Sequence, residues 1–240
     1  MRPNYFDEAV AARYDADAAE MFAPDVVTPA VDFLSELAGN GRALELGIGT
    51  GRIAVPLHQR GVDVHGIELS EAMAARLLAK PEAAGIEVTI GDFAVARAPG
   101  SYRLAYLVFN TIENLTTQDE QVACFVNVAA QLESGGCFVI EVLVPSLRLL
   151  PPGETVRAFS VGTSYLGFDE FDVANQRLTS HHYWLDEGRR VSMPFRYAWP
   201  AEFDLMARIA GMTLRERWSG WTRTPFTSES TNHISVWEKA

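Results

Sequence analysis

Acidic residues and glycines stand at positions in this sequence where they could hold a nucleoside. Gly47, Gly49 and Gly51 alternate in a loop after an apolar stretch, and glycines there let the backbone approach a ligand closely. Glu68 ends the next apolar stretch, 21 residues after Gly47, and a carboxylate in that place accepts hydrogen bonds from ribose hydroxyls. Asp92 ends a third apolar stretch, where a carboxylate can accept the exocyclic amine of adenine. Together the three features favour a site for an adenosine-like group.

The segments around these residues alternate between strand and helix patterns. Short apolar strands are predicted over 43–47, 62–68, 86–92, 102–109 and 135–144. Helices are predicted over 49–61, 70–80 and 116–134. Within these helices, Ser70 is an expected N-cap, Thr116 or Thr117 another, and Pro56 an expected kink.

Two further helices are predicted ahead of the first strand. Residues 7–22 are rich in alanine, which favours a helix. Thr28 and Pro29 are typical of the N-cap and the first position of a second helix, which Gly39 can end.

The alternation of strands and helices implies a parallel sheet with both faces covered. The right-handed crossover rule makes that sheet doubly wound. Residues 155–198 break the alternation with four aromatic-rich strand patterns, which predict an antiparallel meander. A helix over 200–211 and two final strands follow. We therefore expect an α/β fold with a doubly wound, mostly parallel seven-stranded sheet and an antiparallel β insertion before the last helix and hairpin.

Composition excludes several function classes. Hydrophobic residues make up 48% of the 240 residues, the net charge is -11, and no run of Lys or Arg stands out. We expect no nucleic-acid partner, because binders of polyanions usually carry a basic patch. No apolar run approaches the length of a membrane span, and no signal peptide is visible. The two cysteines, Cys124 and Cys137, predict buried thiols in a reducing compartment, and hence a cytoplasmic location.

The glycine spacing separates two classes of nucleotide-binding fold. Dinucleotide folds use G-x-G-x-x-G, whereas here Glu45, Gly47, Gly49 and Gly51 stand at alternate positions. This pattern resembles the first motif of the class I S-adenosylmethionine-dependent methyltransferases. The resemblance implies that S-adenosylmethionine is the cofactor and that the residue at the Glu45 position helps to orient its amino-acid end.

Further motifs resemble the same family. "VHGIELSEAM" is similar to the second motif, which places Glu68 on the ribose and Leu69 and Met73 near adenine. "GDF" resembles the adenine-reading motif, with Asp92 as the acceptor and Phe93 beside the ring.

The resemblance extends to both ends of the cofactor-binding half. "LVFNTIENL" follows the fourth strand, where the family places the cofactor beneath the substrate entrance, so Phe109 and Asn110 are expected to contact it. "ARYD" is similar to the N-terminal lids of small-molecule members, in which a tyrosine at the Tyr14 position approaches the carboxylate of the cofactor. Residues 1–150 and 199–240 would then form the cofactor-binding domain, and residues 151–198 would cover the acceptor site.

Candidates for acid–base chemistry are few. Some sugar N-methyltransferases place a histidine where this chain has Asn114, preceded by Glu113. Glu113 either anchors an amine by charge or caps the next helix. His181 and His182 lie on opposite faces of a predicted strand in the insertion, so one of them should face the acceptor site. No oxygen-rich ligand cluster stands out, so no metal is expected.

The C-terminal half resembles small-molecule methyltransferases, including sugar N-methyltransferases and glycine-type N-methyltransferases. The resemblance implies methyl transfer to nitrogen or oxygen of a small molecule, such as a natural-product or sugar intermediate, by a monomer or a homodimer. Two alternatives stay open. One is a non-catalytic module that binds S-adenosylmethionine. The other is an NAD(P)-dependent oxidoreductase, which the glycine spacing and the lack of a Tyr-x-x-x-Lys pair disfavour.

Overall fold

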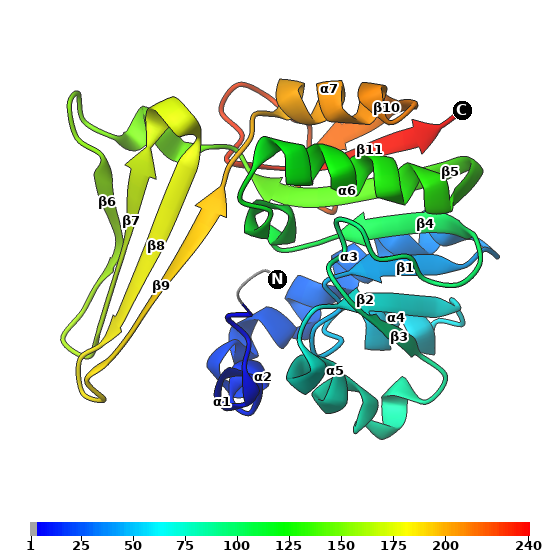
Figure 1. Ribbon diagram of the computed structural model, residues 1–240, viewed down its shortest axis with the longest axis horizontal. Coiled ribbons are helices and arrows are strands. Elements are labelled where there is room, and N and C mark those ends of the chain that lie inside the picture. The colour runs from blue at the N-terminus through cyan, green and yellow to red at the C-terminus, as the bar shows by residue number, and fades with distance from the viewer. Residues whose placement is uncertain (1–3) are drawn as a thin grey trace.

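The protein consists of a layered α/β body and a separate four-stranded sheet (Figure 1). The structure is a computed structural model, and it describes residues 4–240. The large sheet has seven strands in the order β10-β11-β5-β4-β1-β2-β3. Its strands are β1 (Ala43–Leu46), β2 (Val64–Glu68), β3 (Glu87–Ile90), β4 (Tyr102–Leu107), β5 (Leu132–Leu143), β10 (Met212–Trp218) and β11 (Asn232–Lys239).

The first five strands are parallel and the last two form an antiparallel edge. β1 pairs in parallel with β2 and β4, β2 with β3, and β4 with β5. β11 returns antiparallel to β5, and β10 pairs with β11. The predicted doubly wound, mostly parallel seven-stranded sheet is therefore confirmed.

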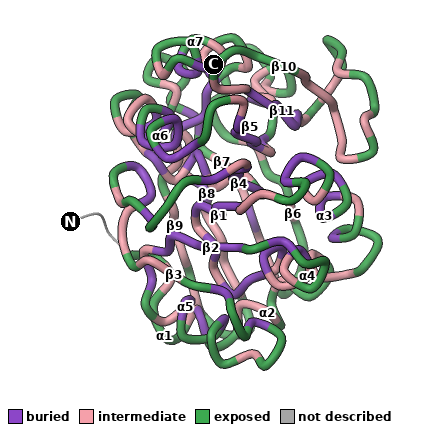
Figure 2. The backbone as a smooth tube through the Cα atoms, turned by 90° about the vertical axis from the view of Figure 1, so that its right-hand side faces the viewer, coloured by how far each residue is buried: buried purple, intermediate pink, exposed green. Residues whose placement is uncertain are grey.

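Helices cover both faces of this sheet. The α-helices are α1 (Glu8–Ala11), α2 (Tyr14–Asp17), α3 (Pro24–Ala38), α4 (Ala54–Gln59), α5 (Glu71–Leu78), α6 (Gln118–Gln131) and α7 (Pro200–Ile209). Figure 2 shows α6 and α7 on one side of the strands and α3 and α4 on the other. Short 3₁₀ turns are η1 (Ala19–Phe22), η2 (Pro81–Ala83), η3 (Thr111–Asn114), η4 (Ser146–Leu149) and η5 (Val173–Asn175). Within residues 4–240 none of the helices has the length and apolar character to cross a membrane.

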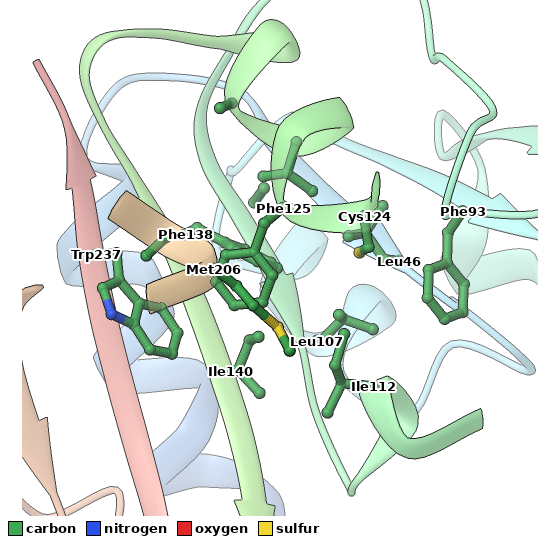
Figure 3. Packing of buried hydrophobic residues seen from close by; sticks show 14 of the residues in the cluster. Leu46, Phe93, Leu107, Ile112, Cys124, Phe125, Phe138, Ile140, Met206 and Trp237 are labelled. Carbon is green, nitrogen blue, oxygen red and sulfur yellow. The ribbon is translucent and has the colours of Figure 1, made fainter. Parts of the chain in front are cut away.

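Two apolar cores fix the sheet between the helices. The core under α6 and α7 gathers rings around Phe125, which lies 5.1 Å from Phe138 and 5.4 Å from Trp237 between ring centroids (Figure 3). The opposite core joins α3 and α4 to the other face of the strands, with Phe33 and Leu57 fully enclosed. Both faces of the central strands are therefore dry, as an all-parallel sheet requires.

The antiparallel insertion folds as predicted. Its strands are β6 (Val156–Val161), β7 (Tyr165–Asp172), β8 (Arg177–Trp184) and β9 (Arg189–Arg196), which pair in sequence order. Figure 1 shows this sheet beside the edge at which the parallel strands of the body end. Pro194 in β9 fits an edge strand, because proline cannot donate to a ladder.

The N-terminal helices differ from their prediction. Residues 7–22 do not form one helix but two four-residue helices and a 3₁₀ turn. The next helix begins at Pro24, four residues before the predicted cap Thr28, so Pro29 lies inside it. Pro24 is itself at the first position, where a missing N–H costs nothing.

The helix after the glycine loop also differs from its prediction. It begins at Ala54, later than expected, so Pro56 lies in its first turn and needs no kink. Ser70 caps α5 as predicted, through a 3.2 Å hydrogen bond from the Met73 N–H to its hydroxyl.

The start of α6 offers a test of local structure. Thr117 accepts from the Glu120 N–H at 3.2 Å, and Glu120 accepts from the Thr117 N–H at 3.0 Å, so the two form a capping box. Thr117→Ala removes the hydroxyl acceptor and should lower the free energy of unfolding by about 1 kcal/mol in equilibrium urea denaturation. Ser134→Ala, at an exposed hydroxyl just beyond the helix, is the control and should change it little. Equal effects of the two variants would contradict the role of the capping box.

Candidate functional site

A cavity of about 240 Å³ opens at the ends of β1, β2 and β3. Nine of the residues singled out in the sequence line it together: Tyr14, Gly47, Gly49, Glu68, Leu69, Met73, Asp92, Phe93 and Asn114. Their elements are far apart in the sequence, and the parallel topology brings them to one edge of the sheet.

The glycine loop leaves β1 and is held by β2. The N–H groups of Gly47 and Ile48 both donate to the carbonyl of Ile67, at 2.8 and 3.2 Å. Gly49 has a φ of +56°, and a Cβ there would meet only the end of the Met73 side chain closely, at 3.5 Å. Gly51 serves packing instead, because its Cβ would lie 2.3 Å from Leu77, and it does not line the cavity.

Glu68 is the best-anchored polar group of the cavity. Its two carboxylate oxygens accept from the N–H groups of Gly49 and Ser70, each at 2.8 Å. Only 7% of Glu68 is exposed, and burial raises the pKa of its carboxyl group while the N–H groups of Ser70 and Gly49 oppose the shift. The carboxylate thus fastens the glycine loop to the start of α5 and keeps acceptor capacity toward the cavity.

Asp92 and Phe93 follow β3 at the opposite wall. One Asp92 oxygen accepts from the Ala94 N–H at 3.0 Å. The Phe93 carbonyl accepts from the amide of Asn127 on α6, at 3.2 Å. These bonds hold both residues beside the cavity.

Glu45 lies beneath the glycine loop and does not line the cavity. Its carboxyl group accepts from the Tyr106 hydroxyl at 2.9 Å. Burial raises the pKa of Glu45 to about 8, against the opposing effects of Tyr106 and of the Arg52 charge. The residue therefore acts on the cavity only through the loop above it or through its charge.

Arg52 follows the glycine loop and was not singled out from the sequence. Its guanidinium lies 5.3 Å from the Phe109 ring centroid, and its charge lowers the pKa of Tyr14, which burial raises. The Arg52 charge also lowers the pKa of Glu45, against the effect of burial. Arg52 does not line the cavity, but a cation near this end of the site could have been predicted from its position between Gly51 and the following helix.

Phe109 and Asn110 end β4 in a strained turn and stay outside the cavity. Both have positive φ, of 55° and 60°. The Asn110 side chain accepts from the Leu143 N–H at 2.8 Å, and Glu141 accepts from the Phe109 N–H at 2.9 Å. The turn is thereby tied to the end of β5, with the Phe109 ring 46% exposed.

The acid–base candidates lie in two places, the turn η3 after β4 and strand β8 of the four-stranded sheet. Asn114 lines the cavity, whereas Glu113 is buried beside it in η3. Thr117 caps α6, so the alternative role of Glu113 as that cap is wrong. His181 and His182 lie on β8, neither lines the cavity, and both bond within their own sheet, to Ser192 at 2.8 Å and to Tyr165 at 2.6 Å.

Six lining residues were missed at the sequence level: Asn4, Tyr5, Phe6, Thr111, Thr116 and Pro194. The first three belong to the N-terminal segment, whose Phe6 carbonyl accepts from the Ser70 hydroxyl at 2.5 Å. The adjacent aromatic residues Tyr5 and Phe6 were the available signal. In the described part of the chain, no group of three or more His, Cys, Asp or Glu residues is placed to hold a metal ion.

Comparisons with known proteins agree on one kind of chemistry. A family model described as "Methyltransferase domain" matches residues 43–136. The cypemycin N-terminal methyltransferase of a Streptomyces species is 26% identical, over 99% of this chain and 98% of its own length. The CcbJ methyltransferase of Streptomyces caelestis is 36% identical over 88% of each chain, with a TM-score of 0.79.

A more distant structure shares the fold over the whole chain. CalS10 with bound S-adenosylmethionine, an amino pentose methyltransferase of Micromonospora echinaspora involved in calicheamicin biosynthesis, superposes with a TM-score of 0.68. It covers 100% of both chains at 19% identity, which shows the fold alone.

The buried carboxyl group of Glu45 predicts a pH dependence of stability. Its pKa in the folded protein, about 8, exceeds the ordinary 4.5, so the folded state binds more protons between these values and loses stability as pH rises. Glu45→Gln should flatten that fall between about pH 6 and about pH 8, by at most about 1.4 kcal/mol per pH unit. Urea denaturation across this range measures the slope. The exposed Glu82→Gln serves as control, and an unchanged slope in Glu45→Gln would contradict the assignment.

Proposed function

This chain belongs to the class I S-adenosylmethionine-dependent methyltransferases, and from that premise we propose that it methylates a nitrogen of a small-molecule acceptor of natural-product type. Oxygen is the second candidate atom. Nitrogen is favoured because relatives named for their activity are an N-terminal methyltransferase, an amino pentose methyltransferase and a sugar N-methyltransferase.

The single observation that supports the cofactor site most strongly is the position of Glu68. Two backbone N–H groups fix its carboxylate in the cavity, and its remaining lone pairs suit the two hydroxyls of a ribose. Asp92 stands across the same cavity, where it would accept the adenine amine, with Phe93, Leu69 and Met73 against the ring. This arrangement of acceptors and apolar side chains supports an adenosine site in the cavity.

The amino-acid end of the cofactor would lie toward Arg52 and Tyr14. The positive charge of the Arg52 guanidinium lowers the pKa of Tyr14. A carboxylate is the preferred partner of a guanidinium. Gly47 and Gly49 leave room for the chain between the ribose and that carboxylate, since both line the cavity without a side chain.

Methyl transfer requires a nucleophile in line with the activated methyl group. The cofactor supplies an electrophilic methyl on a sulfonium, and the protein contributes positioning and exclusion of water. Thr111, Asn114 and Pro194 line the cavity on the side of the four-stranded sheet. We expect the acceptor to enter there, with residues 151–198 as its cover.

Transfer of a labelled methyl group tests the proposal. We expect S-adenosylmethionine with a deuterated methyl group to yield a deuterium-labelled N-methyl product from a panel of small primary and secondary amines, read by mass spectrometry. Matched alcohols should give little. Gly49→Val, a branched residue at a positive φ inside the cavity, is the inactive control. Cofactor binding without any product would contradict the proposal. Product from alcohols alone would identify oxygen, and not nitrogen, as the methylated atom.

Removal of the ribose acceptor tests the cofactor site separately. Glu68→Ala should weaken S-adenosylmethionine binding by about tenfold to a hundredfold in titration calorimetry, because hydrogen bonds to a charged group are lost. Glu71→Ala, three residues further on and exposed, is the matched control and should bind normally. Equal affinity of the two variants would place the ribose elsewhere.

A further inference from the structure

Glu113 is a buried acidic residue that the cofactor site does not use. It lies in η3, flanked by Thr111 and Asn114, which line the cavity, and is 7% exposed. Among residues 4–240 its carboxyl group makes no hydrogen bond and no ion pair, although α6 begins only five residues later. Burial raises its pKa to about 8. A buried carboxyl group without a partner destabilises the folded state unless a ligand or a cation supplies a hydrogen bond or an opposite charge.

A second carboxyl group, that of Asp169 in the four-stranded sheet, affects the pKa of Glu113 through its charge, which raises that pKa in addition to burial. Asp169 lies in β7 opposite Ser180 of β8, and Ser180 lies opposite Met193 of β9. This cross-strand row approaches η3, against which β9 packs. Burial raises the pKa of Asp169 as well.

The pair stands next to the cavity and joins the two sheets. Thr111 and Asn114, which flank Glu113 in η3, line the cavity, and so does Pro194 of β9. Glu113 therefore lies directly behind a wall of the cavity, although neither it nor Asp169 is among the lining residues.

The charged groups of β6 and β8 do not neutralise the pair. Burial lowers the pKa of His182, so its ring is neutral near pH 7. His181 is hydrogen-bonded with Ser192 at 2.8 Å. Arg157 lies opposite Asp169 in the β6–β7 ladder, and its charge lowers the pKa of Asp169, but the two form no ion pair. Its guanidinium donates to the Ser146 hydroxyl at 3.4 Å instead.

The charged groups of β9 and β5, which also pack on η3, have other partners. Arg196 pairs with Glu202 at 2.6 Å. Glu141 accepts from the Trp221 ring N–H at 2.8 Å. Within residues 4–240, neither desolvated carboxyl group of the pair thus has an ion pair with a cation.

Resting on the proposed function, we propose that Glu113 and Asp169 form the subsite for the amine of the acceptor, and that Glu113 removes its proton before methyl transfer. An aliphatic amine arrives as an ammonium ion, which has no lone pair. One proton passes from this nitrogen to the Glu113 carboxylate, which becomes a carboxylic acid. The free lone pair then forms the nitrogen–carbon bond as the carbon–sulfur bond breaks, and that electron pair stays on sulfur. The product is a methylated ammonium ion and S-adenosylhomocysteine.

Asp169 serves this step as a positioning residue. Its negative charge stabilises the cation while Glu113 becomes neutral. It is held by a neighbour in its own sheet, because the Ser180 side chain is hydrogen-bonded with its carboxyl group and lowers its pKa. His182 in turn is hydrogen-bonded with Tyr165 at 2.6 Å and with Ser180 at 3.1 Å. These bonds fix the polar row without adding a cation to it.

Binding of an amine and of its alcohol counterpart tests the subsite. The probes are benzylamine with benzyl alcohol and cyclohexylamine with cyclohexanol, titrated by calorimetry into the protein saturated with S-adenosylhomocysteine. The wild-type protein should bind at least one amine about tenfold or more tightly than its alcohol. The affinity for that amine should rise between about pH 7 and about pH 9 as Glu113 ionises.

The variants separate recognition from folding. Glu113→Gln and Asp169→Asn should lose the preference for amine over alcohol while S-adenosylhomocysteine binds as before, and Glu113→Gln should lose the rise with pH. Glu170→Gln is the matched control, because Glu170 is the exposed neighbour of Asp169 on the other face of β7. Loss of amine and alcohol binding in equal measure would show a merely structural role and overturn the proposal.

Two results distinguish this inference from the proposed function. A wild-type protein that binds S-adenosylhomocysteine but prefers none of the amines overturns the subsite and leaves methyl transfer to oxygen open. A wild-type protein that does not bind S-adenosylhomocysteine overturns the proposed function itself.

Discussion

The cavity depends on one buried carboxylate. Glu68 accepts from the N–H groups of Gly49 and Ser70, which otherwise would be unpaired donors at the loop after β1 and at the start of α5. Each would cost about 1–3 kcal/mol if buried without an acceptor. The positive end of α5 further favours a negative charge at this place. The same bonds that stabilise the loop also hold the carboxylate at the cavity, where the ribose contact proposed above requires it.

The N-terminal segment owes its order to this loop as well. Helices of four residues are not stable alone, yet α1 and α2 are held by side-chain bonds. Asp15 accepts from the Thr50 hydroxyl at 2.5 Å and from the Lys80 ammonium at 2.7 Å. Tyr14 and Phe6 are thereby placed against the cavity. The glycine loop therefore lines the cavity itself and, through Thr50, also holds the N-terminal segment that lines it.

Local signals in the sequence predicted most of the fold, and long-range contacts remained invisible. The Ser70 cap, the helix start at Thr117 and the antiparallel order of 155–198 rest on neighbouring residues, and the structure confirms them. The prediction of one helix over 7–22 failed because alanine content carries no information about tertiary contacts such as the bond between Asp15 of α2 and Thr50. Most cofactor candidates could be found because parallel strands end at one edge. The effect of the Asp169 charge on Glu113 could not, since no sequence pattern links η3 to β7.

The carboxyl groups of Glu113 and Asp169 bear on how positive charge moves during methyl transfer. During transfer to nitrogen, positive charge leaves sulfur and appears on the nitrogen. An anion near the nitrogen gains interaction energy as the reaction proceeds, which lowers the barrier instead of only tightening binding. Asp169 can supply this stabilisation once Glu113 has become neutral. An alcohol would gain less, because its oxygen must also lose a proton to avoid an oxonium product. Carboxyl groups close to the acceptor nitrogen, in the subsite proposed above, would thus favour nitrogen on electrostatic grounds.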